Sequence, residues 1–458
     1  MFPTLRDIHN SRFNPQWLRI AARLVVFGCC GALTANAATL CVNPAGTSGC
    51  KTTITAAVNA ASAGDTILIA PGTYKEDVHI KQSVSLIGSR WTVIDASGLP
   101  NGIFIDGMAS APAAGVSHVV VSGITVRNAN FEGILVANGS DISLTGNRVL
   151  DNDKALDPSA GTCNNIDTSF ETNEGGDCGE GVHLMGVNHS TILRNEVAHN
   201  AGGILVTDET GPNDHNLISE NFVHDNVYDC GITLASHGRA HFLPAGIAFG
   251  VWYNTISRNV SERNGIVTPG AGVGIFAPGP GNTDTGNVVI ENIIRDNGAT
   301  GVAMHNHAAP GAPAPPTAPP VNLNDNVITG NHFSGNGPDN PGAPTPGPTA
   351  INIFSKGPIT GTVISQNTFE KEAIDVGFSA PSGELTVHFN DFSAGTAIYN
   401  LNAATVDATE NWWGCPQGPG GAGHCATVTG SGVTTTPWLT SPFNSDEHRG
   451  DQGTFDRR

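Results

Sequence analysis

The sequence predicts an all-β solenoid, a stack of coils made of short strands. A six-residue unit, Asn-x-apolar-x-x-Asn, recurs as NEVAHN at 195–200, NFVHDN at 221–226 and NIIRDN at 292–297. Each copy precedes a small residue and an apolar-x-apolar triplet, such as Gly203 before ILV. These small residues recur every 22 to 24 residues or at longer intervals, and a minimum period with variable insertions is typical of solenoids. The 57 Gly and 29 Pro suit short strands and tight turns better than long helices.

Residues 1–37 are predicted to be a signal peptide. Arg19 and Arg23 precede the apolar stretch 24–33, which ends near a small-x-small cleavage site, ANA at 35–37. The apolar stretch is too short to span a bilayer, and no later segment is long enough. We therefore expect a secreted, periplasmic or cell-surface protein.

The charge of the chain limits its partners. After removal of residues 1–37, 17 basic and 39 acidic side chains remain, a net charge of −22. Nucleic acids and anionic membrane surfaces recruit basic patches, so we expect neither as a partner. A polyanionic substrate would need a bridging cation. We expect a monomer.

Seven cysteines remain after cleavage, and an oxidising compartment favours disulfides between close pairs. The predicted pairs are Cys41 with Cys50, Cys163 with Cys178, and Cys415 with Cys425. The remaining cysteine, Cys230, is predicted to be a buried free thiol rather than a reactive one.

Residues 38–64 are predicted to form an N-terminal cap. Apolar residues between 54 and 61 share one helical face, and a helix here would cover the open end of the first coil. The solenoid is then expected to start at residue 65, with strands at 65–70 and 84–87 joined by a turn at 71–74.

The stretch AVNAASAGDTILIAPGTYKEDVHIKQSVSLIGS resembles the opening of secreted right-handed parallel β-helix proteins of the pectate-lyase-like, pectinesterase-like and NosD-like superfamily. With the Asn/Gly repeats, the resemblance covers roughly residues 53–410. It implies a right-handed parallel β-helix at 65–410. It implies no particular activity, because this superfamily includes lyases, hydrolases, esterases, epimerases and adhesins.

The repeat is consistent with such a coil. Three short strands would stack in parallel on those of the next coil, and the rest of each coil supplies the crossover that parallel pairing needs. Each repeat asparagine is expected to adopt the left-handed conformation in a turn and to bond the amide one coil away.

Residues 411–443 are predicted to form a C-terminal cap. It begins with NWWG at 411–414, followed by a Gly/Pro loop between Cys415 and Cys425. Its tryptophans would cover the last coil, with sugar stacking as the alternative. Residues 444–458 are polar, and we expect them to be disordered.

Long insertions are expected to enclose a groove over one sheet. Three of them directly follow an apolar-x-apolar triplet: 236–250, 278–286 and 308–320. Two others come just before the next small residue: 153–180 and 336–349. Loops on a rigid scaffold are common binding sites. Alternation then predicts pairs of outward side chains: His183 and Met185, Leu205 and Thr207, Thr233 and Ala235, Gly274 and Phe276, Ala303 and His305, Asn352 and Phe354, and Asp375 and Gly377. Just past the strand ends lie Asp208, Glu209, His237, His307 and Lys356.

These groups suit β-elimination or C5 epimerisation of an extended acidic polysaccharide. Both reactions need a cation or amide near the uronate carboxylate and a base that removes the α-proton. The candidate catalytic residues are His237, His305, His307 and Lys356, and the candidate substrate-binding residues are His183, Asp208, Asn352 and Asp375. No cofactor is certain, although Asp208 or Asp375 could hold a bridging Ca²⁺.

Other functions remain open at this point. A glycosidase is less favoured, because the adjacent Asp208 and Glu209 cannot both face the groove if the strand continues through them. His305 and His307 could chelate a transition metal, and His183 could be an ordinary exposed histidine. The main alternative is a non-catalytic adhesion or structural module at the cell surface; an accessory factor resembling the NosD group is weaker.

Overall fold

The computed structural model describes residues 37–109, 114–157, 159, 162–163, 179–240, 243–306, 317–339, 345–393, 395–402 and 404–443. These residues belong to one compact unit that begins at Ala37. Within these ranges, no helix has the length and apolar character needed to cross a membrane. The predicted signal peptide, the C-terminal tail, His307 and Cys178 lie outside the described residues, apart from Ala37 itself.

Sheet A contains 14 strands within the described ranges, each hydrogen-bonded to the strand one coil away. They are β1 (Thr39–Val42), β2 (Asp65–Ile69), β5 (Val84–Ile87), β9 (Val120–Ser122), β12 (Ser143–Thr145), β17 (Thr191–Leu193), β21 (Leu217–Ser219), β25 (Thr255–Ser257), β29 (Val288–Ile290), β32 (Val327–Thr329), β35 (Ile359–Ser365), β38 (Gly383–His388), β40 (Thr405–Asp407) and β42 (Val433–Thr434).

Sheet B is the narrow sheet, in which nearly every strand has three residues. Its described strands are β3 (Gly72–Tyr74), β6 (Thr92–Asp95), β10 (Thr125–Arg127), β13 (Arg148–Leu150), β18 (Glu196–Ala198), β22 (Phe222–His224), β26 (Val260–Glu262), β30 (Ile293–Arg295), β33 (His332–Ser334) and β36 (Thr368–Glu370).

Sheet C contains the apolar-x-apolar triplets, together with short strands that follow some of the insertions. Its described strands are β4 (Val78–Ile80), β7 (Ile103–Asp106), β8 (Val116–Ser117), β11 (Ile134–Ser140), β16 (Glu180–Asn188), β19 (Gly202–Thr207), β20 (Asn213–Asp214), β23 (Ile232–Ala235), β24 (Val251–Trp252), β27 (Val273–Phe276), β28 (Asp284–Thr285), β31 (Val302–His305), β34 (Thr349–Phe354), β37 (Ile374–Ser379), β39 (Thr396–Asn400) and β41 (Thr427–Gly430).

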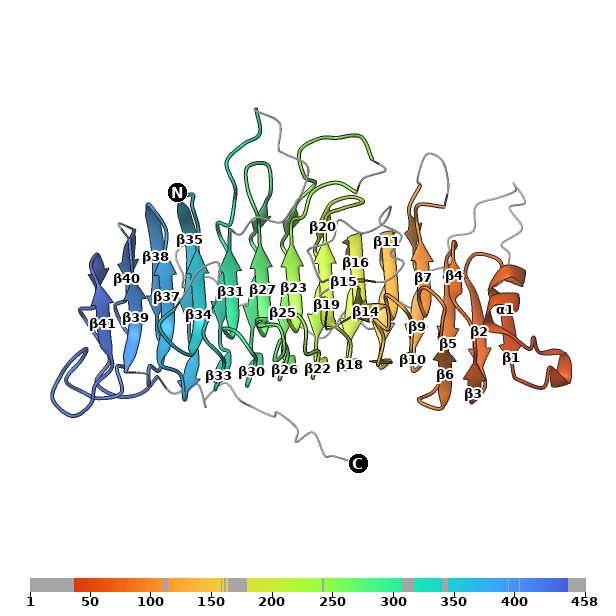
Figure 1. Cartoon of the computed structure of the whole chain (residues 1–458), viewed down its shortest axis with the longest axis horizontal. Coiled ribbons are helices and arrows are strands. Elements are labelled where there is room, and N and C mark those ends of the chain that lie inside the picture. The colour runs from red at the N-terminus through yellow and green to blue at the C-terminus, as the bar shows by residue number, and fades with distance from the viewer. Residues whose placement is uncertain are drawn as a thin grey trace, which may run out of the picture. The chain divides into compact units, whose positions relative to one another are not determined.

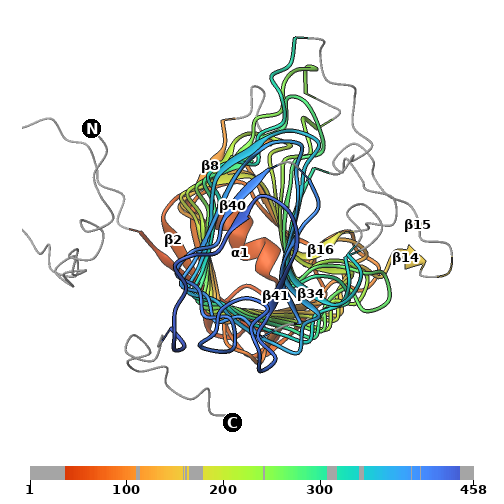
Figure 2. The ribbon, with the colours of Figure 1, turned by 90° about the vertical axis from the view of Figure 1, so that its left-hand side faces the viewer.

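The chain visits the three sheets in turn, and each full visit makes one coil. The coils follow one another from α1 (Ile54–Ala60) to β41 (Figure 1). Viewed along the stack, β2 and β40 of sheet A lie on one wall, and β16 and β34 of sheet C lie on the opposite wall (Figure 2). All ladders within the three sheets are parallel; the antiparallel pair β14 (Leu156–Asp157) and β15 (Thr162–Cys163) lies outside them. The structure therefore has the parallel solenoid that the repeat predicts.

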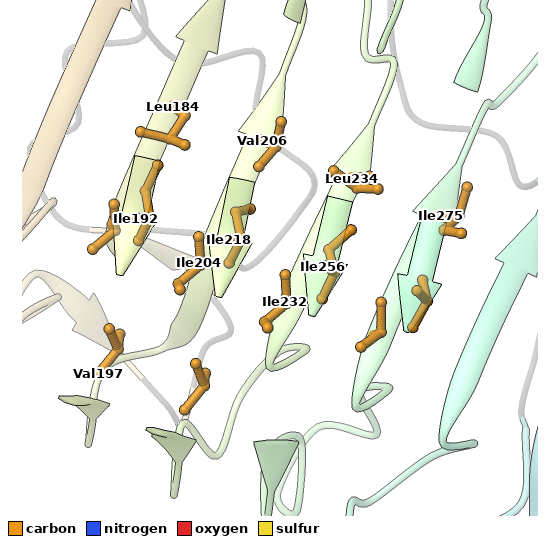
Figure 3. Close-up of a cluster of buried hydrophobic side chains, with 14 of the residues drawn as sticks. Leu184, Ile192, Val197, Ile204, Val206, Ile218, Ile232, Leu234, Ile256 and Ile275 are labelled. Carbon is orange, nitrogen blue, oxygen red and sulfur yellow. The ribbon is translucent and has the colours of Figure 1, made fainter. Parts of the chain in front are cut away.

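Apolar side chains fill the interior in rows that run from coil to coil. Figure 3 shows two such rows, Leu184, Val206, Leu234 and Ile275 from sheet C, and Ile192, Ile218 and Ile256 from sheet A. Each of these side chains is fully buried. Burial of one such side chain stabilises the fold by roughly 1.5–3 kcal/mol, so the rows are the main source of cohesion between coils.

Asparagine ladders run along the three corners of the coil. In each ladder, Nδ2 of one asparagine donates to Oδ1 of the asparagine in the next coil, at 2.9–3.2 Å. The A–B corner holds Asn147, Asn195, Asn221, Asn259, Asn292, Asn331, Asn367, Asn390 and Asn411; the B–C corner holds Asn152, Asn200, Asn226, Asn264, Asn297 and Asn336; the C–A corner holds Asn216, Asn254, Asn287 and Asn326. The expected amide ladder is confirmed, and the two asparagines of each repeat unit belong to different ladders on either side of sheet B.

The expected left-handed conformation of these asparagines is wrong. The residue with positive φ is the one before each asparagine, as at Arg194 (φ 55°), Glu220 (56°) and Arg258 (53°). The asparagine side chain must point into the stack to reach its neighbours, so the preceding residue makes the turn. A left-handed residue other than glycine costs about 1–2 kcal/mol, which the ladder hydrogen bonds offset.

Both ends of the stack extend beyond the predicted boundaries. Helix α1 is capped by Thr53, which accepts from the Ala56 N–H, and it buries Ile54, Ala57 and Val58. A 3₁₀ turn (Thr47–Gly49) precedes it, and β1 already pairs with β2. At the other end, β41 and β42 continue sheets C and A into the predicted cap.

The C-terminal segment places a tryptophan against the last coils. Trp413 is fully buried, with its ring 5.0 Å from that of Phe392, and Trp438 packs partly buried against the core. Disulfides join Cys41 to Cys50 and Cys415 to Cys425, as predicted. The Cys163–Cys178 pair lies outside the described side chains.

Candidate functional site

Register along sheet C brings the predicted outward positions into two rows. The first row contains His183, Leu205, Thr233, Gly274, Ala303, Asn352 and Gly377. The second contains Met185, Thr207, Ala235, Phe276, His305, Phe354 and Ser379. The alternation was therefore predicted correctly up to the coil of β34, and most of these residues are buried or half-buried by neighbouring segments.

Asp375 is an exception. Because Asn352 pairs with Gly377, Asp375 takes the place of the small residue before the triplet, two positions earlier than predicted. It has no exposed surface, and its Oδ2 accepts from the Ser393 N–H at 3.1 Å. The expectation that Asp375 faces outward is wrong, because Asp375 itself stands opposite the small residue Ala350 of the preceding coil.

His183 lies in a buried group of acidic side chains and is not an exposed histidine. Its Nδ1 is 3.0 Å from Oε1 of Glu132 and 4.0 Å from Oε2 of Glu180. Its Nε2 is 3.0 Å from Oγ1 of Thr207 and 3.6 Å from Oε2 of Glu209. We call Glu132, Glu180, His183, Thr207 and Glu209 the His183 cluster. Each member is at least 98% buried.

Asp208 anchors the segment that follows β23. Its carboxylate accepts from the N–H groups of Gly238 and Gly250 and from the Ser236 hydroxyl, at 2.6–3.2 Å. Burial raises the pKa of Asp208, and burial together with the nearby Asp208 charge raises the pKa of Asp284 well above its usual value. The half-buried His237 interacts electrostatically with both carboxylates.

Asp208 and Asp375 were also the expected Ca²⁺ ligands. Both are fully buried and hydrogen-bonded to backbone N–H groups. Neither carboxylate therefore has exposed surface with which to bridge a cation to a substrate.

His305 lies at the end of β31, with its Nε2 2.8 Å from Oδ2 of Asp339. The Asn352 Nδ2 donates to the same oxygen at 2.9 Å. In the next coil, the backbone N–H of the exposed Lys356 donates to Oδ1 of Asn306, the residue after His305, at 3.3 Å. His305, Asn352 and Lys356 thus lie on neighbouring coils, whereas His237 interacts electrostatically with Asp208 and Asp284 instead.

Aromatic rings flank His305 on both neighbouring coils. Its ring centroid is 5.8 Å from that of Phe276 and 6.3 Å from that of Phe354. Both phenylalanines are half-buried. The neighbourhood therefore combines a largely buried histidine, half-buried aromatic rings and, on the next coil, an exposed lysine.

Comparison with known proteins agrees with this architecture. Residues 101–244 match the family model of the right-handed β-helix region. The chain is a right-handed parallel β-helix. No curated protein sequence matches it.

Solved structures resemble the β-helix at low identity. ORF18 of Geobacillus virus E2 is 12% identical with a TM-score of 0.44; the match covers 77% of this chain and 57% of ORF18. The pectate lyase Pel9A is 16% identical with a TM-score of 0.48, covering 74% and 77%. PfbA, a surface adhesin of Streptococcus pneumoniae, is 12% identical with a TM-score of 0.46, covering 78% and 82%. At such identities, the activities of these proteins do not transfer to this chain.

Sequence reasoning missed several acidic residues of the β-helix. Glu132 and Glu180 each stand directly before the small glycine of a coil, and this repeated Glu-Gly dipeptide was a signal that both face the same neighbourhood. Asp339 lies within an insertion, where no period indicates its place. Cys230, next to the same glycine position, is a buried free thiol as predicted, and burial raises its pKa well above the usual value.

Proposed function

We propose that this β-helix is an exported protein that engages an extended acidic polysaccharide along the outer face of sheet C, and that it removes the α-proton of a uronate there. The observation that carries the proposal is the pairing of His305 with Asp339, one coil away from the exposed Lys356, whose backbone N–H donates to Asn306. A positioned histidine is the commonest general base, and a neighbouring carboxylate stabilises the imidazolium that forms.

Lys356 has the properties needed to bind the substrate carboxylate. It is exposed and positively charged, and it follows β34, one coil away from His305. Its ammonium group would pair with the uronate carboxylate and so stabilise the negative charge that develops when the α-proton leaves. Phe276 and Phe354 would present ring faces to the sugars on either side.

The reaction then has two possible outcomes from the same carbanion. In elimination, the electron pair forms the C4–C5 double bond, the glycosidic C4–O bond breaks, and the leaving oxygen takes a proton from water. In epimerisation, water delivers a proton to C5 from the opposite face, and no bond of the chain breaks. Both outcomes use His305 and Lys356 in the same roles.

The test is incubation of the mature protein with alginate, pectate and glycosaminoglycans, with and without Ca²⁺. Elimination gives an absorbing unsaturated uronate, and epimerisation changes the uronate ratio measured by NMR. We expect His305→Ala to lower the rate by about 10²–10⁴-fold, the usual contribution of general base catalysis. Lys356→Ala should also lower the rate.

His79→Ala is the matched control. His79 lies on the same face of sheet C and contacts Asp106 at 2.7 Å, but it belongs to the coil of β4, far along the stack from β31. This variant should keep full activity. If the wild-type protein binds a polysaccharide and yields neither unsaturated product nor a changed epimer ratio, the catalytic role is wrong and the protein is a non-catalytic binding module.

A further inference from the structure

The His183 cluster is a second group of chemically active side chains that the proposed function does not use. Its members come from three successive coils: Glu132 precedes β11, Glu180 and His183 lie on β16, and Thr207 ends β19, followed by Glu209. One oxygen of Glu132, one of Glu180 and one nitrogen of His183 all lie within 4.8 Å of one another.

The hydrogen bonds fix which nitrogen of His183 faces the carboxylates. The Thr207 hydroxyl donates to Oε2 of Glu209 at 2.8 Å, so its oxygen must accept the hydrogen on Nε2 of His183. In a neutral imidazole, Nδ1 then carries a lone pair. That lone pair points toward Oε1 of Glu132, 3.0 Å away, and Oε2 of Glu180, 4.0 Å away.

Three electron-rich atoms in such proximity require a positive charge among them. A proton on Nδ1 would supply a single charge against three buried carboxylates, those of Glu132, Glu180 and Glu209. A divalent ion supplies two charges and bonds directly to all three facing atoms. Buried carboxylates are costly without a compensating positive charge, and the two charges of a divalent ion compensate three carboxylates better than one proton does.

We propose that Glu132, Glu180 and His183 bind a divalent transition-metal ion of the Zn²⁺ class. Imidazole and carboxylate together suit Zn²⁺ and similar ions, whereas Ca²⁺ takes oxygen ligands alone. Two ligands of a tetrahedral Zn²⁺ ion lie roughly 3.4 Å apart, and the Nδ1–oxygen distances of 3.0 and 4.0 Å bracket that value.

The remaining members of the cluster have the role of supporting groups. A metal-bound histidine commonly donates its other N–H to a hydroxyl or carboxylate, which fixes the orientation of the ring. The chain His183–Thr207–Glu209 has this arrangement. The ion would join the coil of β11 to that of β16, so it would stabilise the fold whether or not a polysaccharide binds.

The test begins with wild-type protein stripped of metal by a chelator and then titrated with Zn²⁺, with calorimetry for binding and thermal melting for stability. We expect one equivalent to bind and to raise the melting temperature, because the ion binds the folded state. The Glu180→Gln variant should no longer bind this equivalent of Zn²⁺. Thr207→Val, which removes no ligand, should weaken binding by about 10–100-fold.

The control is the double variant His189→Ala/His215→Ala. His189, Asp214 and His215 form an exposed group that could also bind Zn²⁺, and the double variant removes it. This control variant should still bind one equivalent of Zn²⁺ at the His183 cluster. The proposal is wrong if wild-type protein binds no Zn²⁺, or if the control loses the equivalent while Glu180→Gln keeps it.

Nitrogen NMR of the imidazole provides a test that needs no variant. In Zn²⁺-saturated wild-type protein, Nδ1 of His183 should show the shift of a metal-bound nitrogen and Nε2 that of an N–H. If both nitrogens carry hydrogen under these conditions, a proton compensates the cluster and the proposal is overturned.

Discussion

Glu372 occupies the position where the B–C ladder would otherwise continue with an asparagine. Both the N–H and the Nδ2 of Asn336 donate to its Oε1, at 3.1 and 3.0 Å. Burial raises the pKa of Glu372 to about 7, although the Asn336 hydrogen bonds oppose this rise. A single residue therefore makes the end of the ladder sensitive to pH.

The direction of this pH dependence follows from the pKa of Glu372 in the folded and unfolded chain. The folded chain holds the Glu372 proton more tightly than the unfolded chain, whose carboxyl has a pKa near 4.5. The stability that the protonated form provides is complete below pH 4.5 and is lost as pH rises through about 7. A shift of this size corresponds to about 3 kcal/mol.

Glu372→Gln tests this prediction. Glutamine keeps the acceptor for Asn336 and cannot ionise, so the variant should gain stability relative to the wild type as pH rises from 5 to 8. The measurement is the urea midpoint of both proteins at several pH values. Parallel pH profiles would contradict the prediction.

At the scale of the element, each ladder asparagine serves two coils. Asn259 accepts from the N–H and Nδ2 of Asn221 and donates to Oδ1 of Asn292 and the carbonyl of Ile218. Its removal would leave buried donors and acceptors on three neighbouring segments without partners. The cost of such groups is about 1–3 kcal/mol each.

We therefore expect Asn259→Ala to destabilise the protein by about 2–5 kcal/mol in chemical denaturation. Asn59→Ala is the control, because Asn59 is exposed on α1, and a surface change of this kind stays within about 0.5 kcal/mol. Equal effects of the two substitutions would show that the ladder contributes nothing.

The elements also show which features the sequence could predict. The triplets and the asparagine unit were visible because they repeat, and each coil imposes the same packing on them. The surroundings of His183 were not visible, since Glu132 lies 51 residues before it and contacts it only through the stacking of coils. Asp375 was misplaced because its coil carries an aspartate where the others carry glycine or alanine, so the period gave the wrong register.

At the scale of the whole molecule, the disulfides lie near the two ends of the stack. They close loops with sequence separations of 9 and 10 residues, beside α1 and beside Trp413. Chain-entropy estimates give about 3 kcal/mol for loops of this size. Because each coil contacts only its neighbours, a change at an end acts first on the terminal coils.

Reduction with a thiol should therefore loosen the two ends before the centre. Hydrogen exchange should rise in β1 and β2 and in the segment 413–434, while β19, β23 and β27 keep their protection. A uniform rise along the whole chain would contradict this expectation and would indicate that the coils unfold as one unit.

The ladders have one further consequence, which concerns how such a chain can lengthen. Every rung donates toward the C-terminal coil and accepts from the N-terminal one. If one coil with corner asparagines were duplicated, the new asparagines would accept from the amide groups of the coil before them. They would donate to the amide oxygens of the coil after them, so the direction of every ladder hydrogen bond would stay the same. Glu372 accepts from Asn336 but has no amide to offer, and growth of the B–C ladder ends at that coil.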